Sequence, residues 1–182
     1  MTFFSLQALV TFLNKYQNEL KTPVGDFGGS LKSQQKAVRK VQGKKVAKNF
    51  IKNTSTVQNV LASGGITDYQ ILDFATGFDL LKPIKGKKFG LGICMDMLEH
   101  VTQPFIVAKN ISNSLKKGAL LFVTVPFIWE IHDHPGDYFR YTPQGLAVLF
   151  PSLKCLELFM VRDEAADEAV PRARVVGIFR KN

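Results

Sequence analysis

The chain has few of the features that mark secreted or membrane proteins. Among its 182 residues there are only two cysteines, Cys94 and Cys155, and they form no CxxC pair of the kind found in zinc sites. No apolar run approaches the roughly 20 residues needed to cross a bilayer. Residues 1–21 lack the basic region and cleavage site of a signal peptide. These absences predict a cytoplasmic protein with reduced thiols and no membrane span.

Acidic residues are missing from one long stretch, residues 27–67. Eight basic residues fall there and account for nearly all of the net charge of +9: Lys32, Lys36, Arg39, Lys40, Lys44, Lys45, Lys48 and Lys52. A solvated, lysine-rich helix and loop is the simpler interpretation, and a docking face for a phosphate-bearing or nucleic-acid partner is the alternative. Only Phe50 is aromatic among these lysines, so nucleic-acid binding is possible but not favoured.

Strand-like and helix-like patterns alternate along the rest of the chain. Helical patterns cover residues 3–20, 31–42, 105–115 and 142–150, and the third of these is closed by Lys116, Lys117 and Gly118. Strand patterns cover residues 24–30, 46–51, 69–74, 89–95, 119–125, 156–161 and 175–179, and the strand at 119–125 stops at Pro126. This alternation predicts an α/β fold, a doubly wound and mostly parallel sheet with an antiparallel C-terminal strand. We expect one domain over 1–182, with an N-terminal helix in 1–21 and the α/β core in 22–182.

One stretch carries a specific resemblance. Phe89-Gly-Leu-Gly-Ile-Cys-Met-Asp-Met-Leu-Glu-His-Val101 resembles the motif of class I S-adenosylmethionine-dependent methyltransferases (type 11-like), in which an apolar strand ends in an acid followed by Leu-Glu-His-Val. Leu115-Lys-Lys-Gly-Ala-Leu-Leu121 is similar to the turn before their fifth strand, and Asp137-Tyr-Phe-Arg-Tyr-Thr142 to a branch acting on small molecules, lipids and glycans. The resemblance covers about residues 89–150. It implies a Rossmann-like fold and S-adenosylmethionine as cofactor.

The resemblance also implies the residues that would hold this cofactor. Asp26, Gly28 and Gly29 match the acid and the glycine turn after the family's first strand, where glycine lets the backbone approach a ligand closely. A second match, at 71–77 with Gly77, lies too close to Leu98 to leave room for two intervening strands and is the less favoured one.

The other cofactor positions depart from the family's pattern. The carboxylate that usually accepts hydrogen bonds from the ribose hydroxyls is absent, and Asn53, a weaker acceptor, stands nearest to its place. Asp79, with Asp73 as the alternative, matches the acid near the adenine. Met95 and Asp96 lie at the end of the fourth strand.

The acceptor side is predicted in the loop from Trp129 to Tyr141. His132, oriented by Asp133 or Asp137, is the first choice for a general base, with Arg140 as the third catalytic residue; His100, Trp129, Tyr138 and Tyr141 are the predicted substrate contacts. In the alternative interpretation Arg140 pins the loop to Asp137 or Glu130, and His100 has a structural role. His132 and His134 form a His-x-His pair without a convincing third ligand, so no metal site is predicted.

The leading hypothesis is a methyltransferase of a small molecule, lipid or sugar. The missing ribose acid favours a second hypothesis, a methyltransferase-fold binding module that has lost catalysis. A third is an RNA methyltransferase that uses the basic segment. No Asn-Pro-Pro-Tyr-type motif follows the fourth strand, which argues against methylation of nucleic-acid amino groups.

Overall fold

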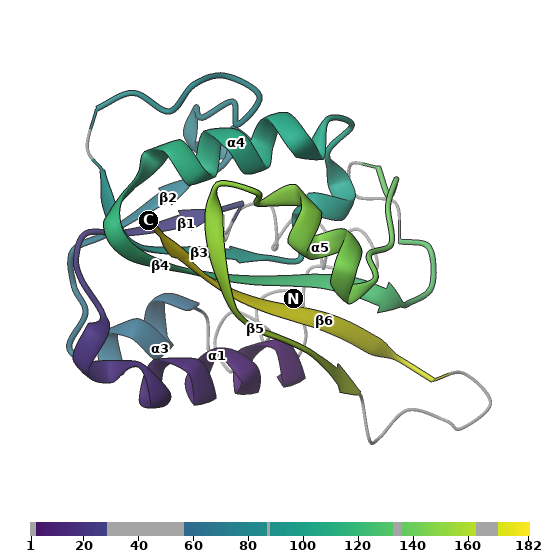
Figure 1. Ribbon diagram of the computed structural model, residues 1–182, viewed down its shortest axis with the longest axis horizontal. Coiled ribbons are helices and arrows are strands. Elements are labelled where there is room, and N and C mark those ends of the chain that lie inside the picture. The colour runs from purple at the N-terminus through teal and green to yellow at the C-terminus, as the bar shows by residue number, and fades with distance from the viewer. Residues whose placement is uncertain (1–2, 29–56, 87, 133–135, 163–170) are drawn as a thin grey trace, which may run out of the picture.

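The computed structural model describes residues 3–28, 57–86, 88–132, 136–162 and 171–182. Within them, six strands form one sheet in the order β2-β1-β3-β4-β6-β5 (Figure 1). The strands are β1 (Val24–Phe27), β2 (Tyr69–Leu72), β3 (Phe89–Met95), β4 (Leu115–Ile128), β5 (Leu153–Arg162) and β6 (Ala173–Lys181). The first four run parallel, while β6 is antiparallel to both β4 and β5. The predicted mostly parallel sheet with an antiparallel C-terminal strand is confirmed; the expected elements at 31–42 and 46–51 lie outside the described residues.

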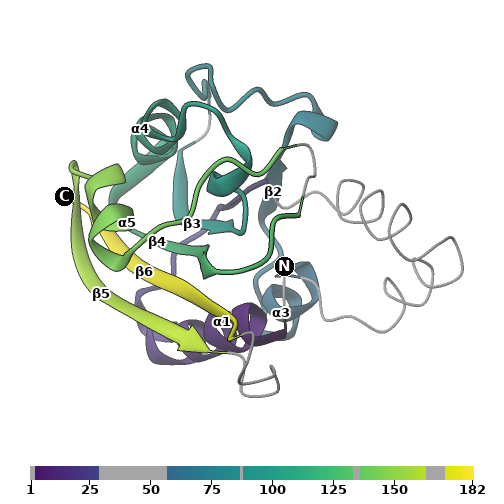
Figure 2. The same ribbon diagram turned by 90° about the vertical axis from the view of Figure 1, so that its right-hand side faces the viewer.

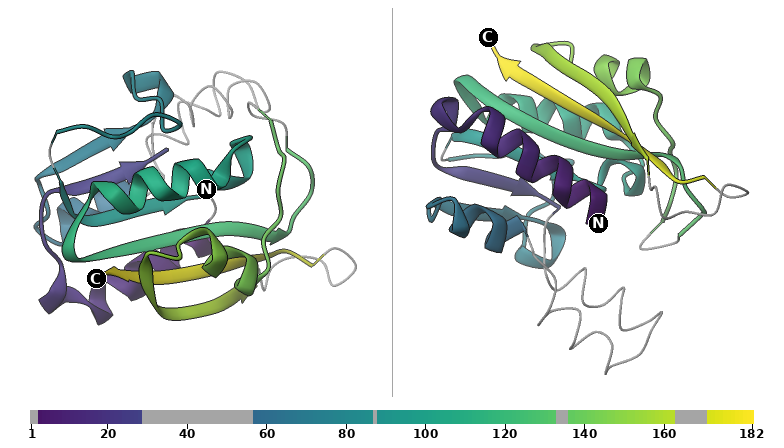
Figure 3. Two further views of the ribbon diagram at one scale, coloured as in Figure 1. Left: turned by 45° about the horizontal axis from the view of Figure 1, so that its top comes forward. Right: turned by 90° about the horizontal axis from the view of Figure 1, so that it is seen from below.

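Helices cover both faces of this sheet (Figures 1 and 3). Helices α1 (Phe3–Lys15) and α3 (Val57–Ser63) lie against one face, where Leu9, Phe12 and Leu61 pack on Leu91, Ile93 and Phe122. Helices α4 (Pro104–Ser114) and α5 (Pro143–Leu149) lie against the other, where Val107, Ile111 and Leu146 pack on Phe27, Leu121 and Val123. None of the helices in the described residues is long and apolar enough to span a bilayer.

The start of α5 is the one that the sequence predicts. The Thr142 side chain accepts a hydrogen bond of 3.1 Å from the backbone N–H of Gly145, and Pro143 occupies the first helical position. Because the cap fixes where the helix begins, it also fixes the end of the loop that joins β4 to α5.

Strand β4 is longer than the sequence predicts. Helix α4 ends at Ser114, so Lys116, Lys117 and Gly118 belong to the strand and not to the end of the helix. Buried Leu115 pairs with Phe89 of β3, which starts the strand four residues early. At its other end, the strand continues through Pro126 to Ile128. The last β4 residue paired with β3 is Thr124, so the missing N–H of proline breaks no hydrogen bond with that strand.

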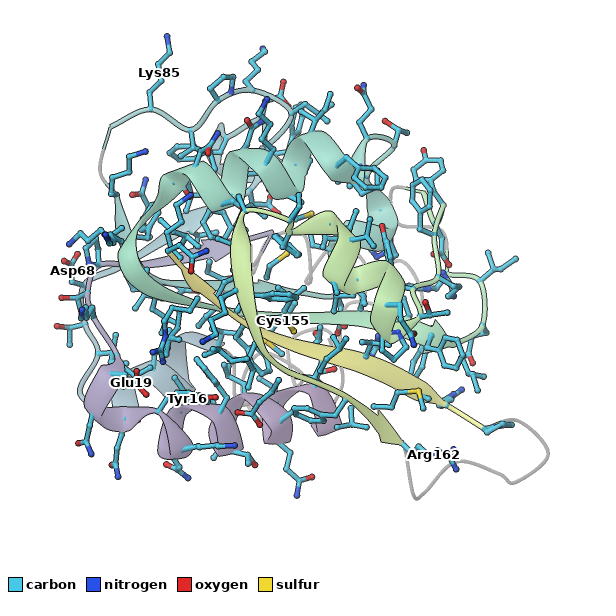
Figure 4. All side chains as sticks on the ribbon, in the orientation of Figure 1. Tyr16, Glu19, Asp68, Lys85, Cys155 and Arg162 are labelled. Atoms are coloured by element: carbon cyan, nitrogen blue, oxygen red, sulfur yellow. The ribbon has the colours of Figure 1, made fainter. Side chains whose placement is uncertain are left out.

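Helix α1 is shorter than predicted, and polar contacts fix its end against the antiparallel strands. It stops at Lys15, and a 3-10 turn follows at Gln17–Glu19. The Tyr16 hydroxyl donates to Glu157 of β5, and Glu19 accepts from Arg180 of β6 at 2.5 Å. Tyr16 and Glu19 lie together at this end of the helix in Figure 4. The N-terminal segment is thus joined to the sheet by both packing and hydrogen bonds.

Candidate functional site

The parallel strands end at one edge of the sheet, which faces the viewer in Figure 2. Strands β1 and β3 are neighbours, yet the chain leaves β1 toward β2 on one side and leaves β3 toward β4 on the other. Open α/β sheets bind ligands at the carboxyl ends of their strands, at such a reversal of strand order. The candidate site is therefore built from the residues around Phe27, Leu72, Met95 and Ile128.

Gly28 follows β1 at this point of reversal. Its φ is +85°, in the left-handed region that favours glycine, and its N–H donates to the Leu72 carbonyl at 2.9 Å. A Cβ on Gly28 would lie 2.3 Å from Cγ of Met97. Close packing and backbone conformation both require glycine here. Gly29 and Asn53, the two predicted cofactor residues nearest in sequence, lie outside the described residues.

Asp26 is almost fully buried within β1, with 1% of its surface exposed. Its carboxyl group accepts a hydrogen bond from the Tyr69 hydroxyl of the neighbouring strand β2. Burial raises the pKa of Asp26 to about 7, against the lowering effect of the tyrosine hydrogen bond. Asp26 is therefore largely protonated at mildly acidic pH, while an ordinary carboxyl group is ionised there.

Two further acids follow β2. Asp73 comes directly after the strand and is 9% exposed. Asp79 lies in the next loop, where one carboxylate oxygen accepts from the backbone N–H of Leu81 at 3.0 Å and the other lies 3.4 Å from Nζ of Lys82. Because β2 is the neighbour of β1, the structure puts Asp73 at the end of the strand next to the glycine turn, and Asp79 farther along the chain.

At the end of β3, Met95 is buried and Asp96 has a left-handed backbone with φ of +50°. The Asp96 carboxylate lies 3.0 Å from Nη1 of Arg174 and accepts a 3.0 Å hydrogen bond from the Thr124 hydroxyl. Arg174 is 2% exposed, so this is a buried ion pair. Asp96 thus lies at the predicted place but is bonded to neighbouring protein groups.

Trp129 begins the loop after β4 and packs against two arginines of β6 and its approach. The guanidinium carbons of Arg174 and Arg172 lie 4.3 and 4.9 Å from the centre of its ring, distances typical of cation–π contacts. Arg172 also donates two hydrogen bonds to the Glu130 carboxylate, of 3.1 and 2.7 Å. These contacts hold the start of the loop against the start of β6.

Glu99 and His100 lie in the short turn η3 (Leu98–His100) that follows β3. The Glu99 side chain is fully buried, and no other described residue donates a hydrogen bond to either of its carboxylate oxygens. Burial, together with the nearby Asp96 carboxylate, raises the pKa of Glu99 to about 8. Oε1 of Glu99 lies 3.6 Å from Nε2 of His100, and Nδ1 of His100 lies 2.5 Å from the Gly136 carbonyl. Burial lowers the pKa of His100.

His132 and Asp137 form the predicted pair. Nδ1 of His132 lies 3.0 Å from Oδ2 of Asp137 and 3.2 Å from the Glu130 carbonyl oxygen. Both neighbours accept hydrogen bonds, so Nδ1 carries the proton and the lone pair of neutral His132 is on Nε2. The His132 ring meets the His100 ring edge-on, with centroids 4.9 Å apart. Asp133 and His134 lie outside the described residues.

Arg140 has an acceptor for every N–H of its guanidinium group. Two go to the Asp137 carboxylate, and the others reach the backbone carbonyls of Trp129, Glu130 and Phe139. This bidentate contact holds the pKa of the fully buried Asp137 carboxyl well below its usual range. The Arg140–Asp137 contact is the one that the sequence left as an alternative to a catalytic role for Arg140.

The two tyrosines of the loop occupy different surroundings. Tyr141 is buried, and its hydroxyl donates to the Leu98 carbonyl at 3.0 Å. Tyr138 is 55% exposed, and its backbone N–H donates to the Glu99 carbonyl at 2.8 Å. The loop after β4 is therefore bonded to the turn after β3, which brings His100 and His132 together at the carboxyl edge.

The fold of the chain is similar to that of several solved structures. The chain resembles the N-methyltransferase NodS from Bradyrhizobium japonicum in complex with S-adenosyl-L-homocysteine, at 13% identity, with 97% of this chain and 87% of that one covered and a TM-score of 0.57. It also resembles a candidate methyltransferase from Bacillus halodurans, at 12% identity, 94% and 98% coverage and a TM-score of 0.61. The chain has the class I methyltransferase fold.

Within the class I methyltransferase fold, other chemistry also occurs. The [4+2]-cyclase SpnF matches this chain at 13% identity, with 96% of this chain and 82% of that one covered and a TM-score of 0.56. No known family's sequence profile matches the chain, and no curated protein sequence matches it either. The likeness therefore establishes the fold, and the activity has to be argued from the side chains.

Three residues at this edge were assigned no role by the sequence. Glu99 lies between Asp96 and His100 in the sequence, and nothing there marks it as a buried acid, because its burial depends on how the turn after β3 packs. Arg174 alternates with Val176 and Ile178 along β6, a period-two pattern that puts it on a buried face. Met97 has no sequence signal, because its contact with Gly28 exists only in the folded sheet.

Proposed function

We propose that this chain is an S-adenosylmethionine-dependent methyltransferase of a small-molecule, lipid or sugar acceptor. The observation that carries the proposal is the convergence of two groups at the point where the strand order reverses. Gly28 and Asp73 follow adjacent strands β1 and β2, and the His132–Asp137 pair lies in the loop that is bonded to the turn after β3.

The side chains on the cofactor side fit an adenosyl group. Asp73, at the end of the strand beside the glycine turn, supplies a carboxylate for the ribose hydroxyls, and this removes the need for Asn53. Gly28 leaves its backbone free for close approach. Met97 fills the volume beside Gly28, and its flexible thioether side chain has to turn aside for a ligand to enter.

On the acceptor side, the chain has to orient a nucleophile and receive its proton. A sulfonium cofactor brings an already activated methyl group, so positioning supplies most of the catalysis. Nε2 of His132 has the lone pair that a general base needs, because Asp137 and Glu130 hold the proton on Nδ1. Arg140 supports this histidine through Asp137 and does not reach the acceptor itself.

Titration calorimetry with S-adenosylmethionine and S-adenosylhomocysteine tests the cofactor assignment. We expect one site per chain, and at least tenfold weaker binding in Asp73→Asn, because a neutral amide loses a charge-assisted hydrogen bond. Asp79→Asn is the matched control, since the Asp79 carboxylate is bonded to Lys82 and the Leu81 amide. An unchanged affinity in Asp73→Asn would show that another residue binds the ribose.

A second candidate function is cofactor binding without methyl transfer. Met97 beside Gly28 and the buried Asp96–Arg174 pair favour it, since both occupy the edge where the cofactor would lie. Binding of S-adenosylhomocysteine without turnover of S-adenosylmethionine on any hydroxyl or amine acceptor would support this candidate. The RNA alternative depends on the basic segment, most of which lies outside the described residues.

A further inference from the structure

We propose that Glu99, His100 and His132 form a binding site for a divalent transition-metal ion beside the acceptor loop. One ligand atom from each of these side chains lies within 4.8 Å of the others. Glu99 and His100 come from the turn after β3, whereas His132 comes from the loop after β4. The site therefore exists only in the folded chain and differs from the His132–His134 pair visible in the sequence.

The first support is the buried Glu99 carboxyl group. Its side chain has no exposed surface, and no other described residue donates a hydrogen bond to its two oxygens. Burying a carboxyl group without a partner costs several kcal/mol, so such groups are normally hydrogen-bonded or bound to a metal ion. Nε2 of His100 lies 3.6 Å from Oε1 of Glu99.

The second support is how the two imidazole rings are held. A metal-bound histidine almost always donates its other ring N–H to a carbonyl or a carboxylate. His100 directs Nδ1 to the Gly136 carbonyl, and His132 directs Nδ1 to the Asp137 carboxylate. Both Nε2 lone pairs are thereby left for a ligand. Arg140 in turn donates two hydrogen bonds to Asp137, so the carboxylate that orients His132 is itself held by a neighbour.

The spacing and the donor types indicate which ions fit. Ligand atoms about 2.0–2.1 Å from a zinc ion lie roughly 3.4 Å from one another. The 3.6 Å between Glu99 and His100 is already near this value, and a pair at the 4.8 Å limit would have to close by about 1.4 Å. Two imidazoles and one carboxylate suit Zn²⁺, Co²⁺ or Fe²⁺, whereas Mg²⁺ and Ca²⁺ prefer oxygen ligands. The His132 side chain is 31% exposed, which leaves one side of the site open to an acceptor.

In the proposed methyltransferase, this ion would lie on the acceptor side and His132 would hold it in place of receiving a proton. The inference depends on the proposed function for that role only. Binding of the ion follows from the three side chains and does not require an adenosyl cofactor. The two proposals can therefore fail separately.

The test is a titration of the chelator-treated full-length chain with Co²⁺, followed by visible absorption, and with Zn²⁺, followed by calorimetry. We expect one ion per chain and d–d bands of a four- or five-coordinate Co²⁺ site. Glu99→Gln and His132→Ala should each weaken Zn²⁺ binding at least tenfold, and Asp137→Asn tenfold to a hundredfold through the orientation of His132. Circular dichroism checks that each variant is folded.

Glu130→Gln is the matched control, because Glu130 is a carboxylate of the same loop whose side chain is bonded to Arg172. It should bind Zn²⁺ like the parent chain. Zn²⁺ binding that survives both Glu99→Gln and His132→Ala, or that depends on His134 and not on Glu99, would overturn the site. S-adenosylhomocysteine titrations without metal separate the two proposals. A chain that binds the cofactor but not Zn²⁺ refutes the metal site alone, and a chain that binds Zn²⁺ but not the cofactor refutes the proposed function alone.

Discussion

The stability of this protein should fall as the pH rises from 5 to 7, and Asp26 should be a main cause. In the folded chain burial raises the pKa of Asp26 from the ordinary 3.8 to about 7. Between these two values the folded state holds a proton that the unfolded state has lost. Unfolding then releases a proton, so each rise of one pH unit lowers the free energy of unfolding by about 1.4 kcal/mol.

Asp26→Asn replaces the carboxyl group with a neutral isostere that still accepts from Tyr69. The shift of about three pKa units corresponds to at most about 4 kcal/mol at pH 8, of which about 2 kcal/mol develops between pH 5 and 7. From pH 5 to 7, the free energy of unfolding of Asp26→Asn should therefore rise by about 2 kcal/mol relative to that of the parent chain. Glu99, with its pKa raised to about 8, contributes in the same direction, so the parent's dependence should be reduced and not abolished.

Urea denaturation at half-unit steps from pH 5 to 8 measures this effect. Asp68→Asn is the control, because Asp68 is an exposed acid just before β2 and next to Tyr69 (Figure 4). Its profile should parallel that of the parent chain. If the parent's free energy of unfolding is flat over this range, or if Asp26→Asn keeps the parent's slope, then the Asp26 carboxyl group is ionised in the folded protein and the reasoning is refuted.

Three further outcomes follow from the same contacts. Gly28→Ala should lower the free energy of unfolding by about 2–4 kcal/mol, and adding Met97→Ala to the same chain should restore part of that loss. If nothing is restored, the loss comes from the backbone conformation of residue 28 alone. Arg174→Gln should lower the free energy of unfolding, measured by urea denaturation, by about 3–5 kcal/mol, and by less in a chain that also carries Asp96→Asn. Equal losses in the two backgrounds would mean that Asp96 and Arg174 are not coupled. Arg140→Lys should speed amide exchange in the loop after β4 more than elsewhere; uniform exchange would contradict its anchoring role.

The sequence predicted the sheet better than it predicted the ends of the strands. Apolar runs such as Phe89–Met95 are buried on both faces, and their pattern is strong enough to locate a parallel strand. The extension of β4 to Leu115 and through Pro126 depends on which neighbours pair with each residue, and a local pattern does not contain that information. The cap at Thr142 was predictable because capping is a local interaction.

The cofactor contacts stay predictions, because they depend on strand order. Position along the chain matches Asn53 to the acid after the family's second strand and Asp79, with Asp73 as the alternative, to the acid near the adenine. In the described sheet the neighbour of β1 is β2, and this brings Asp73 beside the glycine turn. Strand order is set by long-range pairing, so the spacing of motifs in the sequence could not reveal it.

The buried charges at the carboxyl edge give the strongest physical reason to expect a function there. A fold that needed only stability would place apolar residues where Asp96, Glu99 and Arg174 lie, because a buried ion pair gains little over well-packed hydrophobic groups. Asp96 and Arg174 at least neutralise one another, whereas none of the other described residues donates a hydrogen bond to the Glu99 carboxyl group, so its burial is costly. The Glu99 carboxyl group lies near His100 and His132, whose Nδ1 atoms are bonded to protein acceptors and whose Nε2 lone pairs are left for a ligand. A metal ion or a substrate bound there would compensate for the cost of burying Glu99.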